Sequence, residues 1–138
     1  MSTDLHGTTA IVTGATGGMG RAITARLAAA GAQVIATDLS DAGADELMAT
    51  APDSIHFVAA DVSVVDEIAG VVAAAMSRTG RLDSSVNAAG IEFETVPLAE
   101  CTDDDFDRMM RINVRGVFLS MKHEITAMLT AGGGSIVN

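Results

Sequence analysis

Short apolar segments rich in Val, Ile and Ala alternate along this chain with longer segments in which apolar residues recur at helical spacing. A short run of β-branched residues predicts a buried strand, and the helical period predicts a helix that packs by one face. Serine or threonine precedes most of the helical segments, and glycine follows several of them, as is typical of helix ends. We therefore expect strands at residues 8–13, 33–37, 55–59, 83–87 and 135–138, and helices at residues 18–30, 40–48, 63–76 and 102–130.

Strands and helices alternate in this prediction from the first segment to the last. Such alternation predicts a parallel sheet, because each crossover helix returns the chain to begin the next strand in the same direction. We expect one doubly wound α/β domain over residues 1–138, with the sequence ending inside the fifth strand. An exposed apolar edge strand tends to pair or aggregate. We therefore expect either a longer natural chain or a second chain that covers this edge.

Composition and charge narrow the range of partners. The chain is 49% hydrophobic and 19% charged, which is typical of a globular protein. Its net charge of −10 and its lack of a basic run argue against binding to nucleic acid or to a membrane surface. No uncharged apolar run is long enough to span a membrane, and the polar first residues do not resemble a signal peptide. The single Cys101 allows no intramolecular disulfide, which favours a cytoplasmic location.

The segment from Thr13 to Gly20 joins the first expected strand to the first expected helix and contains four glycines. Glycine permits a sharp turn and a close approach of the backbone to a ligand. The free N–H groups of the first helical turn, together with the helix dipole, favour a phosphate at this point. The spacing differs from the G-x-G-x-x-G dinucleotide motif but has the same mechanics. Taken alone, the motif is also compatible with a purely structural turn.

Small or polar residues also follow the next three expected strands. Asp38 lies 18 residues after Gly20, near the spacing of about 20 expected for an acid that accepts hydrogen bonds from ribose hydroxyls. Asp61 follows the third strand, and residues 87–90 follow the fourth. Each could be an ordinary turn or could orient a helix cap. Because ligands of parallel sheets bind at the carboxyl ends of strands, the four ends together favour a nucleotide site.

Asp38 also bears on which nucleotide is bound. A carboxylate accepts a hydrogen bond from a ribose 2′-OH but repels a 2′-phosphate. No Lys or Arg lies within the glycine turn or directly after Asp38 to offset this repulsion. The sequence therefore favours NAD over NADP.

The expected helix at residues 102–130 carries an apolar stripe with Asn113 in its middle. A buried amide is costly unless it is hydrogen-bonded, so Asn113 should have a defined partner, which could simply fix the helix register. Gly116 should weaken or bend the helix locally. The three histidines are scattered, and we expect no metal site. The stripe consists of Phe106, Met110, Val117, Met121, Ile125 and Met128.

Taken as a set, five segments resemble the classical short-chain dehydrogenase/reductase (SDR) family, in family order and at family spacing. They are Thr13-Gly-Ala-Thr-Gly-Gly-Met-Gly20, Asp61-Val62, Val86-Asn-Ala-Ala-Gly90, Asn113 and Gly134-Ser-Ile-Val-Asn138. The resemblance implies a Rossmann-type fold and hydride transfer between NAD(P) and an alcohol or carbonyl substrate, commonly in a homo-oligomer formed through the long helix. The cofactor residues that it implies are Gly14, Thr16, Gly17, Gly18, Met19, Gly20, Asp38, Leu39, Asp61, Val62, Asn87, Ala88, Ala89 and Gly90.

The catalytic residues of the family are only partly matched. Asn113 corresponds to the family's catalytic Asn, whereas the catalytic Ser would lie beyond Asn138, and Ser135 is not its equivalent. The family's Tyr-x-x-x-Lys pair would lie further on, and this sequence contains no tyrosine. Ala88 replaces the second Asn of the usual Asn-Asn-Ala-Gly turn. The chain therefore corresponds to the N-terminal half of such an enzyme, and we expect it to be catalytically inactive by itself, with weak or partial cofactor binding.

Two other classes of function remain open from the sequence. A non-catalytic dinucleotide-binding or oligomerising module would use the same fold. A Rossmann-like methyltransferase fits less well, because residues 87–90 and Asn113 would have no role in it.

Overall fold

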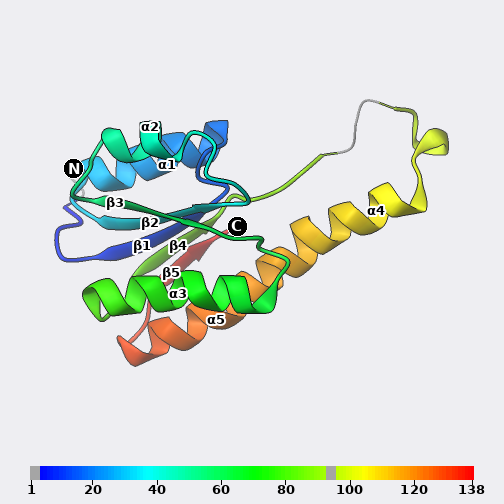
Figure 1. Cartoon of the computed structure of the whole chain (residues 1–138). Coiled ribbons are helices and arrows are strands. Elements are labelled where there is room, and N and C mark those ends of the chain that lie inside the picture. Colours follow the sequence, from blue (N-terminus) through cyan, green and yellow to red (C-terminus); the bar gives the residue numbers. More distant parts are fainter. Residues whose placement is uncertain (1–3, 93–95) are drawn as a thin grey trace.

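A five-stranded parallel sheet of order β3-β2-β1-β4-β5 forms the centre of the computed structural model, which describes residues 4–92 and 96–138 (Figure 1). Neighbouring strands all run in the same direction. The strands are β1 (Thr9–Thr13), β2 (Gln33–Asp38), β3 (Ile55–Ala59), β4 (Ser84–Asn87) and β5 (Ser135–Val137). The chain continues from β1 to β2 on one side and later returns to place β4 on the other. Doubly wound sheets bind ligands at such a change of direction.

Helices cover both faces of this sheet (Figure 1). One face carries α1 (Gly18–Ala29) and α2 (Ala44–Ala49), and the other carries α3 (Val65–Thr79) and the second half of a long helix. The predicted doubly wound, Rossmann-type α/β fold is therefore confirmed. The long helix and the turn before it comprise η1 (Leu98–Glu100), α4 (Asp103–Met110), the π-helical segment η2 (Arg111–Gly116) and α5 (Val117–Thr130).

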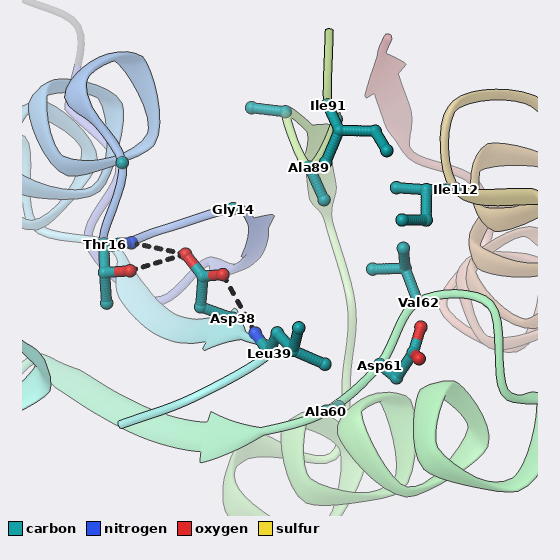
Figure 2. Close-up of a pocket in the computed structure, with 13 residues that line it drawn as sticks. Gly14, Thr16, Asp38, Leu39, Ala60, Asp61, Val62, Ala89, Ile91 and Ile112 are labelled. Carbon is teal, nitrogen blue, oxygen red and sulfur yellow. Dashed lines mark hydrogen bonds between the residues drawn. The ribbon is translucent and has the colours of Figure 1, made fainter. Parts of the chain in front are cut away.

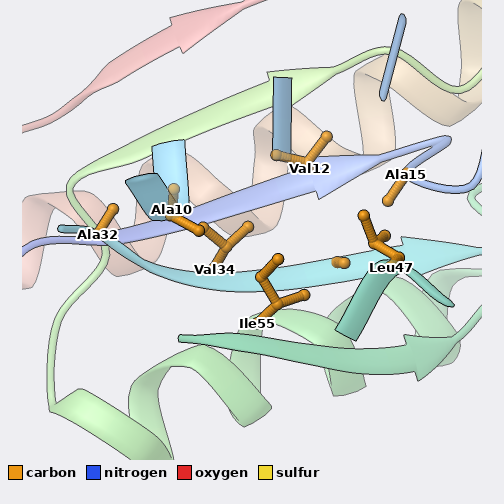
Figure 3. Packing of buried hydrophobic residues seen from close by; sticks show 9 residues of the cluster. Ala10, Val12, Ala15, Ala32, Val34, Leu47 and Ile55 are labelled. Atoms are coloured by element: carbon orange, nitrogen blue, oxygen red, sulfur yellow. The ribbon is translucent and has the colours of Figure 1, made fainter. Parts of the chain in front are cut away.

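Strand β1 packs into two separate cores, because successive side chains of a strand point to opposite faces. Ala10 and Val12 lie in the cluster beneath α1 and α2 (Figure 3). Ile11 lies in the opposite cluster, with residues of α3 and α5. All five residues of β1 are buried, which explains the continuous apolar run in the sequence. Full burial of an aliphatic side chain contributes about 1.5–3 kcal/mol, so β1 stabilises both layers.

The predicted strands are confirmed to within one residue at each end, but two predicted helix starts are wrong. Ser40 does not begin α2, which starts after Gly43, a residue with φ of +81°. Ser63 does not cap α3, because its Oγ donates a hydrogen bond to Asp61 Oδ1 (2.7 Å). The helix begins two residues later and continues past residue 76 to Thr79, with Gly80 as its C-cap. At Ser63 a local side-chain hydrogen bond thus replaces the expected cap.

The predicted start of the long helix is correct, and its predicted weak point is a change of helix type. Thr102 Oγ1 accepts a hydrogen bond from the Asp105 N–H (3.1 Å) and so caps α4. Residues 111–116 then form the π-helical segment that ends at Gly116. A Cβ on Gly116 would lie 2.7 Å from Cγ2 of Val62. The glycine therefore lets the helix approach the loop that follows β3.

The apolar stripe predicted along the long helix coincides only in part with its buried face: Met128 is buried, and Val117 and Met121 are half-buried. Phe106, Met110 and Ile125 are 50%, 38% and 42% exposed. Phe106 and Met110 belong to α4, which buries none of its residues. Hydrogen bonds in a π-helix run from i to i+5, so η2 shifts the faces of the residues after it, including Ile125, relative to a uniform helical period. The buried positions of η2 and α5 are Gly116, Leu119, Ser120, Glu124, Ala127 and Met128.

Candidate cofactor site

A cavity of about 390 Å³ lies at the carboxyl ends of β1, β2, β3 and β4 (Figure 2). Most of the residues predicted to contact a cofactor line it, but Gly18, Met19, Gly20 and Asn87 do not. Sequence reasoning missed the apolar Ala60, Ile91 and Ile112, whose residue types give no chemical signal. The lining consists of Gly14, Thr16, Gly17, Asp38, Leu39, Ala60, Asp61, Val62, Ala88, Ala89, Gly90, Ile91 and Ile112.

The glycines in the turn between β1 and α1 differ in whether packing within the chain requires a glycine at that position. Gly14 has φ of +66°, and a Cβ there would lie 2.8 Å from the Ala88 carbonyl oxygen, so this position requires glycine twice over. A Cβ on Gly20 would lie 2.0 Å from the Gly14 carbonyl oxygen. In contrast, a Cβ on Gly18 would meet nothing within 4 Å. Packing within the chain does not require a glycine at position 18, which leaves room for a bound group beside the first turn of α1.

Three hydrogen bonds hold the Asp38 carboxylate at the rim of the cavity (Figure 2). Oδ2 accepts from both the N–H (3.0 Å) and the Oγ1 (2.6 Å) of Thr16, in the glycine turn. Oδ1 accepts from the N–H of Leu39 (2.9 Å). The carboxylate thus joins the end of β2 to the turn after β1 and places a negative charge beside the cavity.

Two further polar contacts shape the cavity walls. Asp61 Oδ1 accepts hydrogen bonds from the N–H (2.8 Å) and Oγ (2.7 Å) of Ser63, so this carboxylate also orients the turn into α3. The Ala89 N–H donates to Thr13 Oγ1 (3.1 Å), which fixes the loop after β4 against the end of β1. No Lys or Arg is among the described residues that line the cavity. Any phosphate bound here would depend on backbone N–H groups rather than on cationic side chains.

Asn113 has a defined partner, as predicted, although it lies in a half-buried position of η2. Its Oδ1 accepts from the N–H of Ile91 (2.9 Å), and its Nδ2 donates to the carbonyl oxygen of Ile91 (2.7 Å). This paired contact fixes the backbone directly after Gly90 against the π-helical segment. Asn113 does not itself line the cavity, but its partner Ile91 and its neighbour Ile112 do.

Comparison with known proteins identifies the family. The family model described as short chain dehydrogenase matches residues 8–138. The chain belongs to the short-chain dehydrogenase family. The strand order and the glycine turn before α1 agree with this membership.

Curated relatives and solved structures of short-chain dehydrogenases match nearly all of this chain. It is 38% identical to the 2,5-dichloro-2,5-cyclohexadiene-1,4-diol dehydrogenase of Sphingobium indicum, over 98% of this chain and 54% of the relative. It is 38% identical to the levodione reductase of Leifsonia aquatica, over 93% and 50%. A crystal structure of levodione reductase superposes with a TM-score of 0.88 at 36% identity, over 97% and 54%. The chain spans about half the length of the curated relatives it matches.

Glu124 is a buried acidic residue that sequence reasoning missed. Glu124 is 1% exposed. Its carboxyl group accepts hydrogen bonds from Ser85 Oγ (2.5 Å) and from Asn87 Nδ2 (3.1 Å). Burial raises the pKa of Glu124 above its ordinary value, although the hydrogen bonds from Ser85 and Asn87 oppose this shift. The amide of Asn87 also donates to Asn138 Oδ1 (2.9 Å). Asn87 therefore faces α5 and the end of β5 rather than the cavity.

Neither a metal centre nor a membrane helix is found in the described part of the chain. Residues 4–92 and 96–138 contain no group of three or more His, Cys, Asp and Glu side chains that could hold a metal ion. Within the same residues, no helix has the length and apolar character needed to cross a membrane.

Proposed function

We propose that this chain supplies the cofactor-binding part of an NAD-dependent oxidoreductase that transfers a hydride between NAD(H) and an alcohol or carbonyl substrate. The observation that carries the proposal is the Asp38 carboxylate, held at the rim of the cavity by Thr16 and Leu39. A carboxylate in this place accepts hydrogen bonds from ribose hydroxyls and repels a 2′-phosphate. Two similar solved structures give support: an NAD+-bound xylitol dehydrogenase at 29% identity, and a 3-ketoacyl-(acyl-carrier-protein) reductase complexed with NADH at 35%.

The proposed contacts follow the cofactor along the edge of the sheet. Residues 14–20 receive the pyrophosphate, where the glycines and the first turn of α1 allow close approach. Asp38 accepts from the adenosine ribose, while Asp61 and Val62 lie beside the adenine. Residues 88–90 line the central part of the cofactor, whereas Asn87 faces away from the cavity. The space beside Gly18, where a Cβ would meet nothing within 4 Å, is consistent with this placement.

We propose a catalytic role for Asn113 in the complete enzyme, in keeping with its place in the family pattern. In this chain its amide holds the Ile91 backbone beside the cavity. Bound NAD would supply the hydride acceptor. The sequence contains no tyrosine to act as the phenolic acid or base that the family uses. We therefore expect the 138-residue chain to bind the cofactor without turning over an alcohol substrate.

Calorimetric titration of the 138-residue chain with NAD+, NADP+ and S-adenosylmethionine tests this proposal. We expect NAD+ to bind, and NADP+ to bind about tenfold or more weakly, because of the repulsion by Asp38. Asp38→Asn should weaken NAD+ binding by about tenfold, since hydrogen bonds to charged groups contribute about 1.5–3 kcal/mol. Asp41→Asn makes the same charge change at an exposed position and is the matched control.

Two results would contradict the proposal. Binding of S-adenosylmethionine without NAD+ would instead indicate a methyltransferase. Tighter binding of NADP+ than of NAD+ would overturn the cofactor assignment while leaving the family unchanged.

We also propose that the chain forms a homo-oligomer through its long helix. Apolar side chains on this helix remain exposed, including Phe118 at 63% and Leu129 at 71%. A stable assembly through this face is also what a purely oligomerising module would show, and such a module would not bind NAD+. The free, half-buried Cys101 is compatible with the proposed cytoplasmic location.

A further inference from the structure

Thr16 makes a double contact with Asp38. Its N–H and its hydroxyl both donate to the same carboxylate oxygen, Oδ2, at 3.0 and 2.6 Å (Figure 2). The two residues belong to different crossovers, since Thr16 lies in the turn after β1 and Asp38 ends β2. The hydroxyl is the one side-chain donor that the described residues direct at this carboxylate.

Counting acceptor positions shows what this contact does to the carboxylate. An ionised carboxylate offers about four acceptor positions. Thr16 fills two of them on Oδ2, and the N–H of Leu39 fills one on Oδ1. About one position therefore remains for a ligand hydroxyl. Rotation of the Asp38 side chain toward solvent would break both bonds to Thr16, so the negative charge is fixed beside the cavity.

We propose that Thr16 is a positioning residue for cofactor discrimination, and that its hydroxyl acts through Asp38 to set the preference for NAD over NADP. This inference rests on the proposed function. A ribose 2′-OH can donate to the free acceptor position of a carboxylate that is already in place. A 2′-phosphate meets the same carboxylate, which cannot turn away without losing its bonds to Thr16. Without the hydroxyl, Asp38 gains rotational freedom and tolerates the phosphate better.

No cation in the described lining residues competes with this effect. The nearby Arg21 is engaged elsewhere, because its guanidinium lies 3.4 Å from the Gly43 carbonyl oxygen and 3.6 Å from Glu46 Oε2. The electrostatic selection between NAD and NADP therefore depends on Asp38 and on the hydrogen bonds from Thr16 and Leu39 that hold its carboxylate.

Titration of the 138-residue chain and its Thr16→Val and Thr16→Ser variants with NAD+ and NADP+ tests the inference. Thr16→Val keeps the β-branched shape and removes the hydroxyl. We expect it to weaken NAD+ binding by about three- to tenfold, the loss of one charge-assisted hydrogen bond, and to leave NADP+ binding unchanged or tighter. Thr16→Ser keeps the hydroxyl and should retain the wild-type ratio. Thr50→Val, at an exposed position at the end of α2, is the matched control.

A double-mutant cycle shows whether Thr16 acts through Asp38. In the Asp38→Asn background, Thr16→Val should change the ratio of the two affinities by less than about twofold, because the charge that it positions is gone. An equal weakening of both cofactors by Thr16→Val, or no change in either, would overturn the inference. The proposed function fails if the wild-type chain does not bind NAD+ or if it prefers NADP+. Both results are measured without any Thr16 variant and so are distinct from failure of this inference.

Discussion

The region around β1 and the long helix place the same kinds of side chain in opposite environments. All five residues of β1 are buried, and aliphatic side chains from neighbouring elements cover both of its faces, one of which is shown in Figure 3. On the long helix, Phe118 and Leu129 are 63% and 71% exposed while Glu124 is 1% exposed. The contacts of β1 are therefore complete within the chain, whereas those of the long helix are not. This difference supports the proposal that a second copy covers the exposed face of the helix.

The substitution expected to change the free energy of unfolding most lies in the turn after β1, on the tightly packed side of this comparison. Gly20→Ala places a Cβ 2.0 Å from the Gly14 carbonyl oxygen. Such overpacking of a rigid backbone should lower the free energy of unfolding by about 3 kcal/mol or more. Chemical denaturation followed by circular dichroism measures the change.

Gly18→Ala is the matched control for this substitution, because its Cβ meets nothing within 4 Å. It should leave the free energy of unfolding unchanged or raise it by up to about 1 kcal/mol, the helix preference of Ala over Gly. Equal destabilisation by the two variants would show that the turn is not packed as tightly as its geometry indicates.

A second, intermediate effect is expected at Glu124. Because its pKa is raised mainly by burial, the folded chain binds this proton more tightly than the unfolded chain does. The resulting stability is present below the ordinary pKa of about 4.5 and is lost as pH rises toward the raised native value. Glu124→Gln removes this titration. The wild type should therefore lose free energy of unfolding relative to Glu124→Gln as pH rises from about 4 to about 8, measured by urea denaturation.

Glu100→Gln makes the same change at an exposed position of η1 and is the matched control. A constant difference between wild type and Glu124→Gln across the pH range would contradict a raised pKa for the buried carboxyl. The measured quantity is the difference in free energy of unfolding between wild type and Glu124→Gln. In this difference the contributions of the other titrating groups, including Asp83, cancel. Burial alone would raise the pKa of Asp83, but hydrogen bonds from Arg81 and Thr9 lower it overall, so its contribution to stability is lost only in acid.

The same contrast between β1 and the long helix explains how far the sequence could predict the structure. The strands were predictable because strands such as β1 are buried on both faces and leave a continuous apolar run. Most of the cavity was predictable because its polar and glycine residues follow those strands directly. The helix starts at Ser40 and Ser63 were not, because local turn contacts determine them.

Glu124 was missed for a different reason. A uniform helical period assigns the stripe through Phe106 and Ile125 to the interior, but the π-helical segment η2 changes the phase part-way along. Nothing in the composition of residues 111–116 marks such a segment apart from Gly116. A uniform period of 3.6 residues nevertheless places Glu124 on the same face as Phe106. Its burial was missed because a carboxylate is rarely buried and because its partners Ser85 and Asn87 lie on a strand far away in the sequence.

The smallest effect on unfolding, and the sharpest test of the exposed face, is expected from Phe118→Glu. Phe118 is 63% exposed, so a charge there should change the free energy of unfolding of the monomer by no more than about 0.5 kcal/mol. It should nevertheless disrupt an assembly that buries this face, because an unpaired charge is costly in an apolar interface. Sedimentation velocity over a range of concentrations should show an oligomer for the wild type and a monomer for Phe118→Glu. Thr126→Glu adds the same charge at another exposed position of α5 and should assemble like the wild type if the apolar face is the contact. A wild-type chain that stays monomeric, or a Phe118→Glu variant that assembles normally, would mean that the exposed apolar side chains do not mediate self-association.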